Sequence, residues 1–301
     1  SRVTILQPAQ KPKVVSFPKL YVMMPAGALI VLGLVCGVIV LVEIVDQRVK
    51  SPADVAMVPR TRVLGLVPHA SEDPAAPARV ESVFRDNPSG VLAEHFRQLR
   101  GTVLKRMHAG GHKSLVVMSG QPGSGATTVV CNLAQSLAAA EQNVLVIDAN
   151  FRRPGTHRVF GLGESPGLSD VLAGQKSLAE AVQKTDDPRL SILTAGSQEH
   201  RRFERLATEP MSELLRQAGT QFDIILLDVT PASISGDAMA VANPGDATML
   251  VVRAFGETRG MVARLRNDLS EVRAEFLGVV INAVRSSAGG YMRGNILATH
   301  Q

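Results

Sequence analysis

Aromatic residues are scarce in this chain of 301 residues. They make up 4% of the sequence, and tryptophan is absent. Proteins that bind single-stranded nucleic acids stack bases on aromatic side chains beside a clustered basic surface. Lysine and arginine are scattered here, and the formal net charge is only +5. The composition therefore argues against a nucleic acid as the partner.

Cysteine is rarer still, with two residues, and histidine shows no ordered spacing. Cys36 lies in a long apolar run and Cys131 in a predicted helix, a placement that gives neither a disulfide framework nor a metal site. The seven histidines lack the spacing of metal ligands, so we interpret them as surface or packing residues.

Charge is missing from residues 20–42, the run LYVMMPAGALIVLGLVCGVIVLV. As a helix these residues would span roughly 34 Å, which is enough to cross a bilayer. A signal peptide has a shorter apolar run followed by a small-residue cleavage site, whereas this run ends in Glu-Ile-Val-Asp-Gln-Arg. We predict a membrane-spanning helix rather than a signal peptide or a buried core helix. Basic residues balance on its two flanks, so the positive-inside rule leaves its orientation open.

The chain divides into five predicted segments around this helix. Residues 1–19 contain spaced prolines and are expected to be extended, and residues 43–90 form a proline-rich linker in which Val63–Val67 could add a strand. Residues 91–285 form the main domain, and residues 286–301 form a tail. There is no internal repeat.

The main domain alternates helical and strand-like patterns. Apolar residues recur at helical spacing from Leu92 to Met107 and mark one buried face. Short β-branched runs follow, with amphipathic stretches between them, at residues 114–120, 143–149, 189–196, 222–228, 247–254 and 276–284. Runs that are apolar on both faces are typical of a parallel sheet covered on both sides. We predict a doubly wound α/β domain with a mostly parallel sheet and with ligands at the carboxyl ends of its strands.

A glycine-rich loop lies between a predicted strand and a predicted helix, in SGQPGSGATTVV at residues 119–130. Gly120, Gly125 and Thr127 fit the phosphate-loop pattern Gly-x-x-x-x-Gly-Lys-Ser/Thr, but Ala126 holds the lysine position. Backbone N–H groups of such a loop and the helix N-terminus attract phosphate, and Thr127 holds the position of the Mg²⁺-coordinating hydroxyl. Without its lysine the pattern alone is a weak signal, because glycine-rich turns between strands and helices are common.

Two aspartates strengthen the signal. Asp148 and Asp228 each end an apolar strand-like run, so both are expected at the same sheet edge as the loop. Carboxylates there can hold Mg²⁺ directly or through water. The alternative is that each aspartate caps the turn that follows it.

At this point residues 91–285 resemble the cytoplasmic domain of the bacterial tyrosine kinases (BY-kinases) of polysaccharide co-polymerases, a branch of the P-loop class that includes the partition ATPases. The resemblance rests on six stretches in family order: SGQPGSGATTVVCNLAQSLA, VLVIDANFRRPGTHRVFG, GLSDVLAG, LSILTAG, FDIILLDVTPASISGDAMAVANPGDATMLVVRA and LGVVINAV. It implies a site for ATP or ADP with Mg²⁺. Its nucleotide-binding residues would be Gly123, Ser124, Gly125, Ala126, Thr127 and Thr128. Mg²⁺ would be held by Thr127, Asp148 and Asp228, of which the two aspartates would be catalytic if the enzyme is active.

The resemblance also implies partners and a location. Glu94, Arg97 and Arg100 match the Glu-x-x-Arg-x-x-Arg motif through which these kinases assemble into rings, although Glu94 and Arg97 could simply form an i,i+3 surface pair. The domain would be cytoplasmic at the bacterial inner membrane, with residues 1–19 periplasmic, next to polysaccharide polymerase and export machinery. The chain would then be a fragment that lacks a first membrane helix and a periplasmic domain.

Three departures from the family pattern bear on activity. Ala126 replaces the lysine, Asn150 replaces the second carboxylate of an Asp-x-Asp motif, and Tyr291 is the only candidate acceptor in the tail. We therefore predict a pseudokinase that keeps the scaffold and regulates or supports exopolysaccharide or capsule synthesis and export.

Two alternatives stay open. The first is an active ATP-dependent tyrosine autokinase in which Lys113, Arg152, Arg153 or an arginine of a neighbouring subunit replaces the missing lysine. The second is a partition-type ATPase. It is disfavoured by the apolar run and by Gln121 and Pro122, which stand where that class carries an additional lysine.

Overall fold

The computed structural model describes residues 17–75, 77–234 and 236–285. It divides into two compact units, Ser1–Gln47 and Arg48–Gln301. In the first unit, helix α1 (Leu20–Val45) has no buried residue, and its most apolar 18-residue window has a mean hydropathy of 3.0. The helix is long and apolar enough to cross a membrane, and it continues three residues beyond the predicted run.

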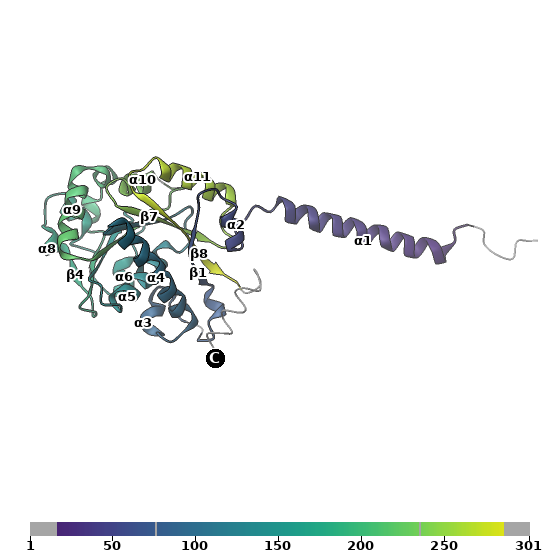
Figure 1. Ribbon diagram of the computed structural model, residues 1–301, viewed down its shortest axis with the longest axis horizontal. Coiled ribbons are helices and arrows are strands. Elements are labelled where there is room, and N and C mark those ends of the chain that lie inside the picture. Colours follow the sequence, from purple (N-terminus) through teal and green to yellow (C-terminus); the bar gives the residue numbers. More distant parts are fainter. Residues whose placement is uncertain (1–16, 76, 235, 286–301) are drawn as a thin grey trace, which may run out of the picture. The chain divides into compact units, whose positions relative to one another are not determined.

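The second unit is built on one eight-stranded sheet (Figure 1). Its strand order is β1-β8-β7-β2-β6-β3-β5-β4, and every pair is parallel except β4 with β5. The strands are β1 (Val63–Pro68), β2 (Ser114–Ser119), β3 (Val144–Ala149), β4 (Gln183–Lys184), β5 (Leu190–Leu193), β6 (Ile224–Val229), β7 (Ala247–Arg253) and β8 (Glu275–Val284). The predicted mostly parallel sheet is confirmed.

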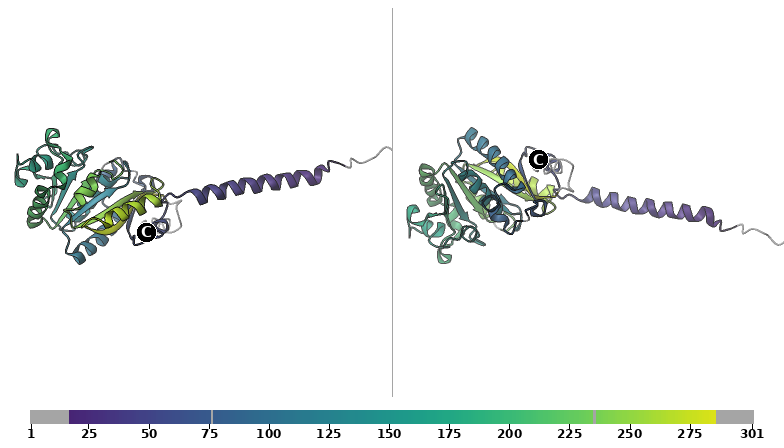
Figure 2. Two further views of the ribbon diagram at one scale, coloured as in Figure 1. Left: turned by 90° about the horizontal axis from the view of Figure 1, so that it is seen from above. Right: turned by 90° about the horizontal axis from the view of Figure 1, so that it is seen from below.

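Helices cover both faces of this sheet (Figure 2). They are α2 (Pro52–Ala56), α3 (Val83–Asp86), α4 (Val91–Gly110), α5 (Ala126–Ala138), α6 (Thr156–Phe160), α7 (Leu168–Leu172), α8 (Leu178–Ala181), α9 (Glu209–Gln221), α10 (Asp237–Ala242) and α11 (Arg259–Ser270). Short 3-10 turns lie at Ala70–Glu72, Val80–Ser82, Gln198–His200 and Phe203–Ala207.

The core consists of two clusters, one on each side of the sheet. Leu115 and Val117 of β2 pack with α3, α4 and α5, whereas Val116 and Met118 pack with α2, α7, α8, α9, α10 and α11. Successive side chains of a strand point to opposite faces, so a strand buried on both sides must be apolar throughout. This explains why the strands read as continuous apolar runs, and it confirms the doubly wound fold.

The segment before α4 adds an edge strand to the sheet. β1 pairs in parallel with β8, which confirms the strand predicted at Val63–Val67. Val49 is fully buried, and Arg48 forms an antiparallel bridge with Thr258. Arg48, Val49 and β1 therefore belong to the α/β unit. The predicted division into five segments stays a prediction.

The sheet topology brings the predicted functional residues to one edge. β2, β6 and β3 are neighbours, and Asp148 and Asp228 occupy paired positions at the carboxyl ends of β3 and β6. The glycine-rich loop leaves the carboxyl end of β2. The loop and the two aspartates thus meet where ligands bind in open α/β sheets.

Candidate nucleotide-binding site

The glycine-rich loop has the backbone conformation that its glycines permit. Gly123 and Gly125 have φ angles of +79° and +91°, in the left-handed region that favours glycine. A Cβ at Gly125 would also collide with the side-chain amide of Asn282. Gly125 is the N-cap residue of α5, and among the described residues no side chain caps that helix. The N–H groups of its first turn are therefore available to an anion.

Side chains from β7 and β8 donate hydrogen bonds to backbone carbonyl groups of the loop. Asn282 Nδ2 donates to the carbonyl oxygen of Ser124 at 2.8 Å, and Arg253 Nη1 donates to that of Gly123 at 3.0 Å. Both bonds engage carbonyl oxygens and leave the loop N–H groups untouched. The loop is thus fixed by contacts that do not involve its lysine position.

Glu257 is a buried carboxylate next to the loop. Its side chain is 1% exposed and accepts hydrogen bonds from the Ser124 hydroxyl and from the backbone N–H groups of Arg253 and Gln121. Burial raises the pKa of Glu257, and these hydrogen bonds oppose the rise. The backbone carbonyl of Glu257 accepts from Val49 N at 2.9 Å. Glu257 therefore connects the phosphate loop to the chain segment that follows α1.

Thr127 and Asp228, two of the predicted metal ligands, are in contact. Thr127 Oγ1 donates to Asp228 Oδ2 at 2.6 Å. Asp228 Oδ1 is buried and has no hydrogen-bond partner within the described chain. Burial raises the pKa of Asp228 well above its usual range, the charge of Asp148 raises it further, and Thr127 lowers it. An orphaned carboxylate oxygen beside a hydroxyl suits a hard cation such as Mg²⁺. The donor set at Thr127 and Asp228 fits that ion.

Asp148 is engaged differently. Its carboxylate accepts from the N–H groups of Asn150, Gly155 and Thr156 at 3.2, 3.0 and 3.0 Å, and from Thr156 Oγ1 at 2.8 Å. Burial raises the pKa of Asp148, and these hydrogen bonds lower it. The side chain is fully buried and does not line the cleft. These contacts match the alternative that Asp148 caps the turn after its strand, so its role as a metal ligand stays a prediction.

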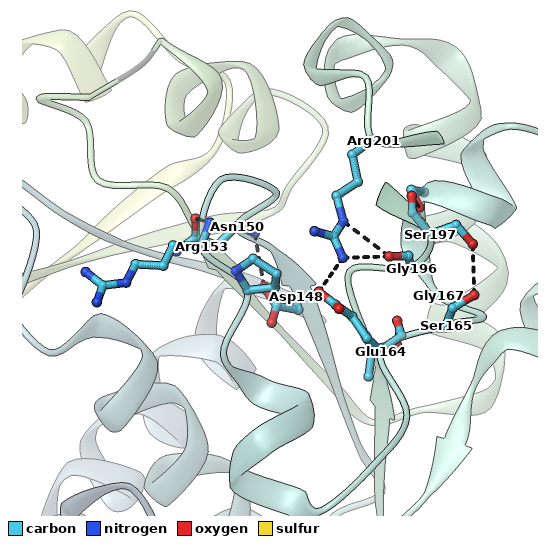
Figure 3. Close-up of polar contacts among 12 residues, drawn as sticks. Asp148, Asn150, Arg153, Glu164, Ser165, Gly167, Gly196, Ser197 and Arg201 are labelled. Atoms are coloured by element: carbon cyan, nitrogen blue, oxygen red, sulfur yellow. Dashed lines mark hydrogen bonds and ion pairs between the residues drawn. The ribbon is translucent and has the colours of Figure 1, made fainter. Parts of the chain in front are cut away.

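Asn150 fills a polar position in the same turn. Its side-chain oxygen accepts from Thr230 Oγ1 at 3.1 Å and from the backbone N–H of Arg153 at 3.2 Å. Figure 3 shows Asn150 beside Asp148, while the side chain of Arg153 extends away from both. An amide oxygen can accept these bonds, but it brings no negative charge to a metal.

A cleft of about 800 Å³ opens at this edge, a size usual for sites that bind small molecules. The loop, the start of α5, the 150–159 segment and the end of β6 line it, as do Arg79, Glu81 and Ser82. Four arginines border the cleft: Arg79, Arg152, Arg153 and Arg158. Arg79 and Arg158 were not singled out from the sequence: Arg158 lies within one of the six family-like stretches, at a position without an assigned role, and Arg79 lies in none of them.

The structure shows which of the candidate replacements for the missing lysine lie near the loop. Lys113 precedes β2 at its amino end, the opposite edge of the sheet from the loop, and donates to the carbonyl of Gly219. Its proposed role as the substitute cation is therefore wrong. Arg152 packs over the ring of Phe203 at 4.6 Å, and Arg158 Nη2 donates to the carbonyl of Pro154 at 2.8 Å.

The predicted ring-forming residues make contacts within the chain. Arg97 Nη1 donates to Glu94 Oε2 at 2.9 Å, and its guanidinium lies 5.4 Å from the ring centre of Phe84. Arg100 Nη1 donates to the carbonyl of Ser136 at 2.8 Å. Glu94 and Arg97 thus form the i,i+3 pair that the sequence offered as the alternative to a ring contact. Ring assembly stays a prediction, and Tyr291 lies outside the described residues.

The fold and the loop are those of a P-loop domain. A family model described as an AAA domain matches residues 112–253. The cell-division ATPase MinD of Pyrococcus furiosus has the same fold, with a TM-score of 0.51 and 23% identity over 62% of this chain and 88% of its own.

Within that class, the relatives are bacterial tyrosine kinases. The tyrosine-protein kinase YwqD of Bacillus subtilis is 29% identical over 66% of this chain and 84% of its own length. The putative tyrosine-protein kinase EpsB of Ralstonia solanacearum is 31% identical over 70% of this chain, which spans only 28% of that relative. The kinase domain of Escherichia coli Etk superposes with a TM-score of 0.72 at 25% identity, covering 79% of this chain and 95% of that domain. The chain belongs to the bacterial tyrosine kinase family.

Proposed function

We propose that this chain is the membrane-anchored, kinase-like module of a polysaccharide co-polymerase, and that it acts in exopolysaccharide or capsule synthesis and export as a scaffold or regulator. Family membership and the apolar helix α1 support the proposal. In it the α/β domain is cytoplasmic at the inner membrane, residues 1–19 are periplasmic, and residues 286–301 form the tail. Glu94, Arg97 and Arg100 serve a ring in addition to their contacts within one chain.

The cleft is proposed to hold ADP or ATP with Mg²⁺. The N–H groups of residues 123–128 would hold the phosphates, and Thr127 and Asp228 would hold the metal. Bound Mg²⁺ would offset phosphate charge. The chain itself contributes the fixed loop, the first turn of α5 and the buried acceptor Asp228 Oδ1. These groups bind and orient a phosphate without requiring a side chain at position 126.

Ala126 is the observation that carries the pseudokinase proposal. Its methyl group lines the cleft at the lysine position, on a loop whose backbone is otherwise intact. A lysine–phosphate pair at ~4 Å amounts to roughly 4 kcal/mol at an effective dielectric of 20. Charge that develops in the transition state would go unmatched, so catalysis should suffer more than ground-state binding. Asn150 removes a second charged group from the same edge.

The test uses the full chain purified in detergent. Titration calorimetry with MgADP should detect binding, while ATP turnover and tyrosine phosphorylation should stay at the level of a Thr127→Ala control. ATP turnover above that control, with phosphotyrosine on the chain, would overturn the pseudokinase assignment.

A second candidate is the active autokinase with a substitute cation. The four arginines that line the cleft favour it. In that case phosphotyrosine should appear and should disappear in Tyr291→Phe. A partition-type ATPase is the third reading, and α1 argues against it because that class lacks such a helix.

A further inference from the structure

We infer that Arg79, in the segment that leads into the α/β domain, supplies the phosphate-directed positive charge that is lost at Ala126. The inference rests on the proposed binding of nucleotide in the cleft. It assigns the substitute cation to a residue outside the phosphate loop and outside the 150–159 turn.

The placement of Arg79 follows from contacts of its neighbours with α5. Asn132, fully buried in α5, donates from Nδ2 to the carbonyl of Val80 at 2.8 Å and accepts at Oδ1 from the N–H of Phe84 at 2.9 Å. These two bonds clamp residues 80–84 across α5. The side chain of Val80 borders a small pocket together with Gly123, Gly125 and Thr128, next to the loop. The segment is therefore held beside the helix N-terminus where a phosphate would bind.

Arg79 itself lines the same cleft as Ala126. Its side chain is exposed, and its guanidinium has no hydrogen bond within the described residues. The nearby carboxylate Asp86 accepts from Ser82 Oγ and from Arg85 Nε, and Arg79 attracts it through its charge without a hydrogen bond. An arginine at the rim whose N–H groups are not hydrogen-bonded can form bidentate hydrogen bonds with phosphate oxygens.

Three other arginines near this edge make contacts elsewhere. Arg152 packs on Phe203, and Arg158 bonds to Pro154. Arg201 is held by Glu164 and the carbonyl of Gly196 (Figure 3). Arg153 is the remaining candidate. It starts from the turn at Asn150, beside β3 and β6, and not from the clamp over α5. It is therefore the comparator in the experiment.

The experiment is a double-mutant cycle on the full chain in detergent, read out as the dissociation constant for MgADP. Arg79→Gln should weaken binding about fivefold to tenfold, the effect of one partly screened charge pair. Arg79→Lys should retain most of the affinity. Arg85→Gln removes the same charge from the same segment outside the cleft, and it should change the constant less than twofold.

The same Arg79 substitutions are then made in an Ala126→Lys background, which distinguishes an effect of the Arg79 charge from an effect on the structure of the segment. Ala126→Lys restores a cation at the loop, so Arg79→Gln should then cost less than twofold. If Arg79 only shaped the segment, its loss would cost the same in both backgrounds. The inference is overturned if Arg79→Gln behaves like Arg85→Gln, or if Arg153→Gln shows the coupling instead. Either result leaves nucleotide binding standing, whereas absence of MgADP binding by the unmodified chain overturns the binding itself.

Discussion

Replacing Glu257 tests whether a buried carboxylate determines the shape of the phosphate loop. In Glu257→Ala the N–H groups of Gln121 and Arg253 lose their acceptor, while the Ser124 hydroxyl keeps the carbonyl of Gln121 at 2.7 Å. An orphaned donor costs about 1–3 kcal/mol when it is fully buried, and these two belong to a half-buried and an exposed residue, so the variant should lose about 1–3 kcal/mol of unfolding free energy in total. Glu257→Gln keeps one carbonyl oxygen and should lose about half as much.

The pH dependence of this effect has a defined sign. Burial raises the pKa of Glu257, so the folded state holds its proton to a higher pH than the unfolded state does. The stability that Glu257 contributes is therefore complete below the unfolded pKa, about 4.3, and declines as pH rises through the folded pKa. Glutamine does not titrate. The advantage of the native chain over Glu257→Gln should be largest below the unfolded pKa and should shrink as pH rises through the folded pKa.

Urea unfolding of the full chain in detergent measures the loss, and hydrogen exchange of residues 119–130 reports on the loop. Glu271→Ala, an exposed glutamate at the end of α11, is the matched control and should stay within about 0.5 kcal/mol. Glu257→Ala with native stability and native exchange in the loop would refute the argument.

Three further changes test other parts of the site. Asp228→Asn should abolish the rise in melting temperature that Mg²⁺ and ADP give the native chain, and an undiminished rise would exclude Asp228 as a ligand. Ala126→Lys should tighten MgADP binding at least tenfold, since even half of a ~4 kcal/mol charge pair exceeds that factor. No gain in calorimetry would mean that the site has lost more than its lysine. Val49→Pro removes the N–H that donates to Glu257 O at 2.9 Å. It should accelerate hydrogen exchange in the loop, and native exchange rates would show that the two segments are uncoupled.

The sheet was predictable because strands buried on both faces consist of continuous apolar runs, which can be recognised in the sequence. Leu115, Val116 and Val117 are apolar in sequence because neighbouring positions face the two core clusters. The glycine pattern and the strand-end carboxylates were visible for a similar reason, since the loop and the two strand ends each follow a short apolar run. Even the edge strand β1 stood out within a proline-rich segment as one short apolar stretch.

The long-range contacts that fix the loop could not be recognised in the sequence. Asn282 reaches the loop from 158 positions away, and Glu257 from 133. No periodicity or motif spacing in the sequence indicates that these two residues contact the loop. Asp148 is a related case. A carboxylate at a strand end is consistent both with a metal ligand and with a cap of the following turn, and only the fold shows that its oxygens accept hydrogen bonds from the turn at residues 150–156.

The shape of the phosphate loop and the charge at position 126 are determined by different groups. Its shape depends on Asn282, Arg253 and Glu257, which engage carbonyls, a hydroxyl and N–H groups away from the cleft. Ala126, at the position where the family pattern carries a lysine, makes none of these contacts and brings no charge to the loop. An alanine at this position is therefore compatible with an intact cradle. A cation that reached the cleft from another segment would strengthen phosphate binding, but it would speed phosphoryl transfer only if it also stabilised the charge that develops in the transition state. Nucleotide binding and phosphoryl transfer must accordingly be measured separately.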